Sequence, residues 1–292
     1  MTTSGSGAQP GRGSGEPPEL RVEQAARLLN WASGRRDREN EKPKIRQNRK
    51  YRAGGPPELR SSSVLSQNEV GYMGRRALPK IDPELDLSRH LYELEMVPQP
   101  LDLTAWFGRT APIELEVGSG KGLFLQTATV ARPEHDFIGV EIIRKYARFT
   151  AFRLAKQQQR NAKVIRGDAR AFLVQWLPEA CLFAVHVYFP DPWWKKRHHK
   201  RRLLDAPFLR EIERVLMPDG QLHFWTDVEA YFTETLSIIA QETQLAGPHG
   251  VAESPAQHDL DYRTHFERRM RLHDLPVYRA EFSKVAAPNE VV

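Results

Sequence analysis

The 292-residue sequence predicts an α/β fold built on a doubly wound, mostly parallel sheet. From residue 113 onward, short β-rich runs alternate with longer amphipathic segments, which is the pattern of a parallel sheet with helices on both faces. Hydrophobic residues make up 40% of the chain, enough to form a sizeable core. Ligands of such sheets bind beyond the carboxyl ends of the strands, so we expect the chemistry at that edge.

Five β-rich runs are the predicted strands. They cover residues 113–117, 136–141, 162–168, 182–189 and 221–227. Between the second and third runs, residues 144–159 repeat apolar side chains at helical spacing and predict a helix. Residues 61–112 are interpreted as a lead-in. Residues 251–292 are expected to form a final strand or hairpin near FERRM and VYRAEF.

The charge of the sequence is unevenly distributed. The chain holds 43 Lys and Arg against 37 Asp and Glu, a net charge of +6. Residues 1–60 contain 13 basic and 7 acidic residues and are rich in Gly, Pro and Ser, which predicts a disordered basic N-terminal arm. We expect residues 61–292 to form a single domain, in which residues 151–202 carry 12 basic against 3 acidic residues. Both concentrations favour an acidic partner, with nucleic acid first.

Composition also excludes several classes of protein. A single cysteine excludes a disulfide framework and favours a reducing compartment. The first twenty residues lack the apolar stretch of a signal peptide, and the longest nearly apolar run, residues 180–189, is too short to cross a bilayer. We therefore expect a soluble, cytoplasmic protein without membrane contact. His258, His265 and His273 lack the spacing of metal ligands, so no metal is predicted.

A glycine-rich turn follows the first predicted strand. The segment ELEVGSGKGLFL places Gly118, Gly120 and Gly122 before a helix, where glycine lets the backbone approach a ligand closely. Acidic residues stand at or near the ends of the first three strands: Glu116, Glu141 and Asp168. A carboxylate about 20 residues beyond such a turn commonly accepts hydrogen bonds from ribose hydroxyls. These features predict a nucleoside pocket that fits either a nicotinamide cofactor or S-adenosylmethionine, and the absence of GxxxxGK[ST] argues against a nucleoside triphosphate.

The fourth predicted strand ends in FPDPWWKKRHHKRRL, residues 189–203. Pro190 and Pro192 restrict the backbone around Asp191 and so fix its carboxylate at the strand end. The two tryptophans that follow offer flat surfaces on which a nucleobase can stack. Six cations come next: Lys195, Lys196, Arg197, Lys200, Arg201 and Arg202. A rigid carboxylate, two indoles and a basic run at this edge of the sheet predict a nucleic-acid site.

This segment resembles the signature of the bacterial tRNA (guanine-N7)-methyltransferases, the TrmB family. The resemblance extends over roughly residues 64–283 and includes ELEVGSGKG, FIGVEI, RGDA, FWTD and THFERR. It implies a class I methyltransferase (Rossmann-like) fold, S-adenosylmethionine as the cofactor and tRNA as the partner. It further implies methyl transfer to N7 of a guanosine at variable-loop position 46, by a monomer or a homodimer.

The resemblance also implies roles for individual residues, with Asp191 as the catalytic residue. The cofactor would be bound by Glu116, Gly118, Gly120, Glu141, Asp168 and Asp191. Guanine or tRNA contacts would fall to Lys195, Asp227, Thr264, His265, Phe266 and Glu267. The basic residues expected to face tRNA are Lys196, Arg197, Lys200, Arg201 and Arg202. The chain departs from the family pattern at Trp194, where members tend to carry Pro or a small or polar residue, and after FERR, where a glycine is missing.

Two other functions fit parts of the sequence. An amino-group nucleic-acid methyltransferase would use a similar cluster of aspartate, proline and aromatic residues, but its motif normally has a second proline where Trp193 stands. A non-catalytic RNA-binding module of the same fold would not bind S-adenosylmethionine. The intact set of glycines and strand-end acids favours cofactor binding instead.

Overall fold

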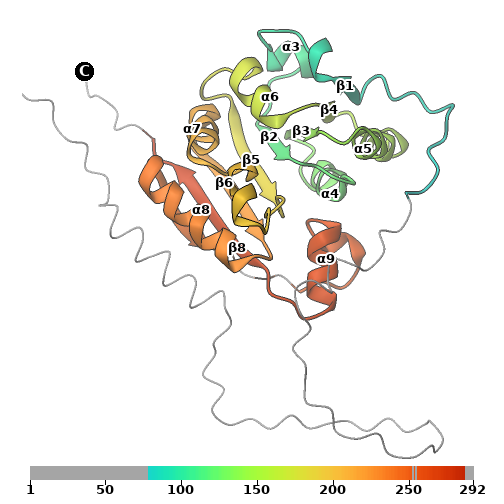
Figure 1. Ribbon diagram of the computed structural model, residues 1–292. Helices are drawn as coiled ribbons and strands as arrows, with labels where there is room; N and C mark the ends of the chain where they lie inside the picture. Colours follow the sequence, from blue (N-terminus) through green and yellow to red (C-terminus); the bar gives the residue numbers. More distant parts are fainter. Residues whose placement is uncertain (1–77, 252, 254, 287–292) are drawn as a thin grey trace, which may run out of the picture. The chain divides into compact units, whose positions relative to one another are not determined.

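Figure 1 shows the computed structural model of the chain, which describes residues 78–251, 253 and 255–286. All of the described helices and strands belong to one compact unit that runs from Asp82 onward. The predicted boundary between residues 60 and 61, and the basic arm before it, lie outside the described residues.

An eight-stranded sheet, in the order β1-β4-β3-β2-β5-β6-β8-β7, forms the centre of this unit. Its strands are β1 (Leu91–Glu93), β2 (Ile113–Val117), β3 (Asp136–Glu141), β4 (Ala162–Arg166), β5 (Leu182–Tyr188), β6 (Leu216–Thr226), β7 (Leu245–Gly250) and β8 (Tyr278–Lys284). Neighbours from β1 to β6 are parallel, whereas β8 is antiparallel to β6 and β7. The winding reverses between β2 and β5, where a doubly wound sheet binds its ligand. The predicted fold class is confirmed.

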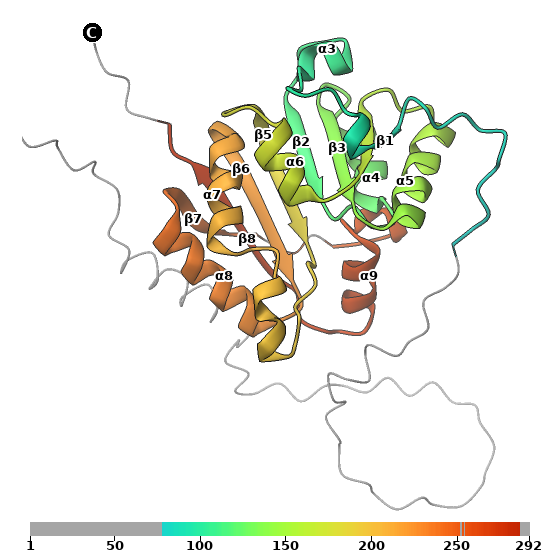
Figure 2. The ribbon, with the colours of Figure 1, turned by 45° about the horizontal axis from the view of Figure 1, so that its top comes forward.

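Helices cover both faces of the sheet. They are α3 (Leu103–Phe107), α4 (Leu123–Ala131), α5 (Arg144–Lys156), α6 (Ala169–Trp176), α7 (Ala206–Val215), α8 (Glu229–Glu242) and α9 (His265–Leu272), with 3-10 helices η1 (Leu94–Met96), η2 (Lys196–Arg201) and η3 (Asp259–Asp261). Figure 2 shows α6, α7 and α8 along one face, and buried side chains of α4, α5 and α9 share a cluster on the other. Within the described part of the chain, no helix is long and apolar enough to span a membrane.

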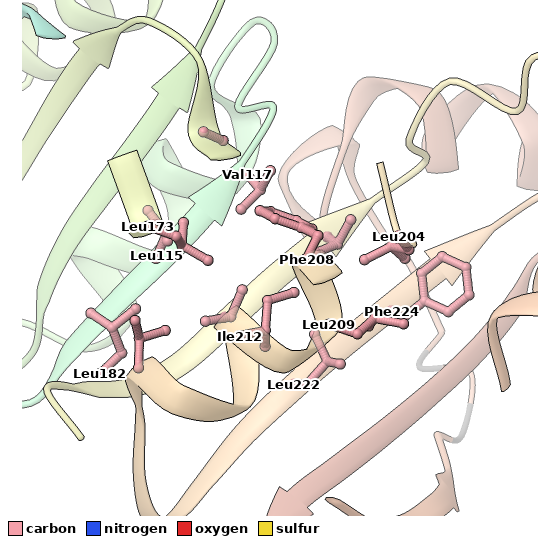
Figure 3. Packing of buried hydrophobic residues seen from close by; sticks show 14 of the residues in the cluster. Leu115, Val117, Leu173, Leu182, Leu204, Phe208, Leu209, Ile212, Leu222 and Phe224 are labelled. Atoms are coloured by element: carbon pink, nitrogen blue, oxygen red, sulfur yellow. The ribbon is translucent and has the colours of Figure 1, made fainter. Parts of the chain in front are cut away.

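The core under α6, α7 and α8 is apolar (Figure 3). Phe208 and Ile212 of α7 lie against strand residues such as Leu115 and Leu222 and are fully buried. The helix begins at this place because the side chain of Asp205 accepts a hydrogen bond from the backbone N of Phe208 at 3.0 Å, which satisfies a free amide of the first turn. The Asp205 cap and the apolar spacing of α7 therefore both stabilise this helix on the sheet.

The opposite face of the sheet carries a polar row that crosses four strands. His186 Nε2 lies 2.7 Å from Glu114 Oε2, and the His186 ring stacks on His223 with 4.5 Å between centroids. His223 Nδ1 in turn lies 2.9 Å from Glu281 Oε1. Burial alone would raise the pKa of Glu114, but hydrogen bonds from His186 and Arg132 lower it to about 2. A shift of one residue in any of these strands would turn its member of the row to the other face, so the row fixes the register.

The predicted strand bounds are confirmed in part. Residues 113–117 and 136–141 are strands as expected, β4 and β5 end slightly earlier than expected, and β6 begins at Leu216 instead of residue 221. The helix predicted over 144–159 ends at Lys156. VYRAEF lies mostly in β8, but the interpretation of FERRM as a strand or hairpin is wrong, because it lies in α9. Thr264 Oγ1 accepts from the backbone N of Glu267 at 3.0 Å, a cap that starts a helix.

Candidate active site

The glycine turn connects β2 to α4. Gly118 and Gly120 adopt φ values of +74° and +54°, which favour glycine. A Cβ atom at Gly118 would meet nothing within 4 Å, so the backbone there faces open space. At Gly122 a Cβ atom would lie 2.3 Å from Thr150 Cγ2, so only glycine fits against α5. The turn is thus open at its first glycine and tightly packed at its last.

Two polar atoms beside this turn are buried without a partner. Glu116 is 2% exposed, and neither its Oε2 nor the Oγ of Ser119 has a hydrogen-bond partner among the described residues. Burial, reinforced by the nearby Glu141 carboxylate, raises the pKa of Glu116 well above 4.5. Buried polar groups are rarely left unpaired, so the two atoms fit the polar groups of a ligand.

Glu141 is the last residue of β3, and Asp168 follows the end of β4. Glu141 Oε2 accepts from the backbone N of Gly120 at 2.8 Å, and its Oε1 accepts from the N of Ile143 at the same distance. Burial raises the pKa of Glu141, although these hydrogen bonds oppose the shift. Asp168 is exposed and caps α6 by accepting from the N of Arg170 at 2.8 Å. Glu141 therefore fastens the glycine turn, whereas Asp168 caps α6 and is exposed to solvent.

Asp191 stands on a strained bend after β5. Its side chain is exposed, and its Oδ1 accepts from the backbone N of Trp193 at 3.2 Å. Phe189 and Trp193 adopt φ values of +51° and +48°, which bulky residues rarely do. Such strain is concentrated at functional sites. Because β2, β3, β4 and β5 are parallel, Asp191 shares an edge of the sheet with Glu116, Glu141 and Asp168.

The basic run forms η2 and the residues beside it. Lys195, Arg197, Lys200 and Arg201 are exposed, and the guanidinium of Arg201 lies 5.1 Å from the ring centroid of Trp193. Trp194 is 58% exposed, whereas Trp193 is only partly exposed. Lys196 begins η2, but its side chain lies outside what the structure describes.

Arg202 is buried, unlike the exposed cations of the basic run. The residue is 7% exposed, and its Nε donates to the backbone O of Pro192 at 2.8 Å. Its Nη1 pairs with Glu234 of α8, and its guanidinium lies 4.7 Å from the ring centroid of Tyr231. Arg202 therefore holds the segment after Asp191 against α8.

The start of α9 and the end of β6 complete the candidate site. His265 Nε2 lies 3.3 Å from Arg153 Nη1, and the ring of Phe266 lies 4.9 Å from that of Phe189. Asp227 is partly buried, which raises its pKa against the opposing charge of Arg269. These contacts join α9 to the strand end that carries Asp191.

Glu267 faces inward from α9. It is 2% exposed, and its Oε2 accepts from the backbone N of Arg263 at 2.6 Å. Its Oε1 lies 3.2 Å from Arg271 Nη1 and 3.5 Å from Arg279 Nη2. Glu267 therefore supports the turn before α9. Its carboxylate already contacts groups of the protein itself, so we expect its effect on substrate to be indirect, through the residues that it positions.

Known relatives identify the family. A sequence family described as "Putative methyltransferase" matches residues 110–280. A tRNA (guanine-N(7)-)-methyltransferase of Rhodopirellula baltica is 46% identical over 218 residues, which cover 73% of this chain and 80% of the relative. The chain belongs to the tRNA (guanine-N7)-methyltransferase family. The expected membership of the TrmB family is thereby confirmed.

Other similar proteins are more distant. A tRNA (guanine-N(7)-)-methyltransferase of Thiobacillus denitrificans is 38% identical over 192 residues, which cover 66% of this chain and 81% of that protein. Among solved structures, the antibiotic-resistance methyltransferase Kmr matches with a TM-score of 0.44 and 17% identity, over 64% of this chain and 93% of that one.

Two residues of this methyltransferase site escaped the sequence analysis. Ser119 lies inside the glycine turn, and its orphaned hydroxyl could have been noticed only once its burial was known. Arg153 of α5 contacts both the glycine turn and α9, and an arginine on an amphipathic helix gives no signal of that. Among the residues that the structure covers, no three His, Cys, Asp or Glu side chains gather as a metal site.

Proposed function

We propose that this chain transfers a methyl group from S-adenosylmethionine to N7 of a guanosine in tRNA, and that the guanosine is position 46 of the variable loop. The observation that carries the proposal is the 46% identity to the R. baltica enzyme over 80% of that enzyme's length. The arrangement of strand-end acids, glycine turn and basic run supports it. Cytoplasmic tRNA is the substrate pool that fits this activity.

The glycine turn is the proposed cofactor site. S-adenosylmethionine, when bound, supplies a methyl group on a sulfonium centre, from which an acceptor lone pair can displace a neutral thioether. Gly118 leaves room for close approach, and the unpartnered atoms of Glu116 and Ser119 offer a hydrogen-bond acceptor and a hydroxyl. Glu141, whose carboxylate already accepts from the backbone N of Gly120, is proposed to accept further hydrogen bonds from ribose hydroxyls. Asp168 and Asp191 lie at the same edge of the sheet.

The chemistry at the acceptor requires orientation more than proton transfer. Guanine N7 presents a lone pair at neutral pH, so the protein needs no base to deprotonate it. Holding that atom in line with the methyl group can supply several kcal/mol of barrier reduction, roughly 7 kcal/mol or more in the best-aligned reactions. Asp191 and Asp227 can accept from the N1 and N2 hydrogens of guanine, which selects guanine over adenine and offsets the developing positive charge.

The exposed cations beside Asp191 are the proposed tRNA surface. Lys195, Arg197, Lys200 and Arg201 can contact phosphates, and the exposed indole of Trp194 can stack on a base that has left the RNA stack. Trp193 is less available because Arg201 covers its ring. The stacking role proposed for this segment therefore belongs to Trp194.

The test is nucleoside analysis of tRNA after incubation with the protein and methyl-labelled S-adenosylmethionine. We expect labelled 7-methylguanosine, which is lost when guanosine 46 of the transcript is replaced by adenosine. Label in an amino-methylated nucleoside would favour the rival amino-group methyltransferase. Tight tRNA binding without any label would favour a non-catalytic module. Label that persists after the replacement would disprove the assignment of position 46.

A further inference from the structure

Arg153 links the cofactor turn to the start of α9. Its Nη1 donates to the backbone O of Lys121 at 3.0 Å, and the same Nη1 lies 3.3 Å from His265 Nε2. Its guanidinium also lies 5.4 Å from the ring centroid of Phe149, one turn earlier on α5. One nitrogen atom thus bridges two elements that are far apart in the sequence.

The turn end of this link is held firmly by α5. Thr150 Oγ1 donates to the backbone O of Gly120 at 3.1 Å, and its methyl group packs where Gly122 has no side chain. Arg153 fixes the next carbonyl, that of Lys121. A displacement of the turn is therefore transmitted to α5 and to the guanidinium.

The α9 end of the link depends on a neutral histidine. Loss of hydration around the ring, together with the charges of Arg153 and Lys121, lowers the pKa of His265 to about 4. At neutral pH the ring is uncharged, and its Nε2 carries a lone pair that accepts from Arg153. His265 directly follows Thr264, the residue that caps α9, so this contact sets the position of the helix start.

We propose that Arg153 is a positioning residue that couples occupation of the cofactor turn to the placement of α9 against tRNA. The inference rests on the proposed function, because it assigns α9 to the tRNA side of the site. Two ligands are coupled when each changes the protein conformation that the other prefers. A cofactor that fixes the Lys121 carbonyl also fixes the Arg153 nitrogen, and through it His265. tRNA then meets a helix start that is already in place.

The measurement is the affinity for tRNA with and without saturating S-adenosylhomocysteine, which fills the cofactor site but supplies no methyl group. For the wild type we expect tRNA to bind about 5- to 150-fold more tightly with the nucleoside present, the usual range of coupling. Arg153→Met should bring this ratio below about twofold. Arg153→Lys keeps the charge but replaces the planar fork with a single ammonium, and it should also lose most of the coupling.

Two further variants make the test specific. Lys156→Met removes an exposed cation from the same helix and should keep the wild-type ratio. His265→Ala should lose the coupling as Arg153→Met does, and the double variant should lose no more than either single one. Circular dichroism reports whether each variant is folded. If Arg153→Met does not fold, Arg153→Lys decides the test.

Two results would overturn the inference. One is a folded Arg153 variant that keeps the wild-type ratio of tRNA affinities with and without S-adenosylhomocysteine. The other is a wild type whose tRNA affinity does not change when S-adenosylhomocysteine is added. Either result can occur while the wild type still forms 7-methylguanosine, in which case only the coupling is wrong. Absence of that product from the wild type would instead count against the proposed function.

Discussion

Replacing Glu116 by glutamine is predicted to stabilise the protein and to weaken cofactor binding at the same time. The carboxylate is 2% exposed, its Oε2 has no partner among the described residues, and Glu141 lies close enough to raise its pKa further. Glutamine keeps the shape of the side chain but carries no charge. The folded protein then no longer has to bury an unpaired carboxylate.

The pH dependence of this effect follows from the direction of the pKa shift. The pKa of Glu116 is raised above its ordinary value of 4.5, so the wild type loses stability as the pH rises above that value and the unfolded chain ionises freely. The Glu116→Gln variant does not lose stability in this way. It should therefore be no more stable than the wild type at about pH 4 and more stable at about pH 8. Glutamine still leaves a buried polar group without a partner, so the gain comes from removing the charge alone. An unsatisfied buried group costs ~1–3 kcal/mol and more when it is charged, and we expect the variant to be more stable by about 1 kcal/mol or more at the higher pH.

The loss of cofactor affinity has a separate origin. A hydrogen bond to a charged group contributes ~1.5–3 kcal/mol, so its removal should weaken S-adenosylhomocysteine binding about 10- to 140-fold. Urea unfolding at both pH values gives the stability, and titration calorimetry gives the affinity. Glu179→Gln, which removes an exposed carboxylate, is the matched control. A Glu116→Gln protein that is less stable than the wild type at pH 8, or that binds the nucleoside normally, would refute the reasoning.

Three further predictions concern the acids and the basic run. Asp191→Ala should abolish or nearly abolish single-turnover methylation of tRNA in a protein that unfolds normally, because the side chain is exposed; near-normal turnover would remove Asp191 from the reaction. Glu141→Ala should weaken S-adenosylhomocysteine much more than tRNA in calorimetry, and equal losses would mean that the carboxylate serves only the fold. Neutralising Arg197, Lys200 and Arg201 should lower the slope of log affinity for tRNA against log salt by roughly 0.7 to 0.9 for each phosphate that the variant no longer neutralises, and an unchanged slope would show that they do not meet the RNA.

Much of the sheet could be predicted because its central strands are buried on both faces. Every residue of β2 and β3 is buried, and both appear in the sequence as short β-rich runs with an acid at or near the end of the strand. The edge strand β1 has only three residues and gives no such run. The wrong prediction at FERRM could have been avoided from the sequence, because Thr264 and Glu267 have the spacing of an N-terminal helix cap.

The site could be predicted only where chain topology brings residues together. Acids that follow parallel strands meet at one edge whatever the details of packing. Arg153 reaches partners 32 and 112 residues away, and no local pattern marks such a contact. Arg202 belongs to a run of cations, and only the packing of α8, with Glu234 and Tyr231, turns this one inward.

The last strand of the sheet has a consequence for how the enzyme is made. β8 is inserted between β6 and β7, so β7 has no neighbour in the sheet until residues 278–284 have left the ribosome. A domain generally folds as a unit, so the sheet is completed only after this segment emerges, although everything from the glycine turn to Asp191 is synthesised earlier. The helix α9, which lies between β7 and β8 in the chain, is fixed at both ends only when the final strand docks. Assembly of the candidate site therefore depends on the last of the described strands to be synthesised.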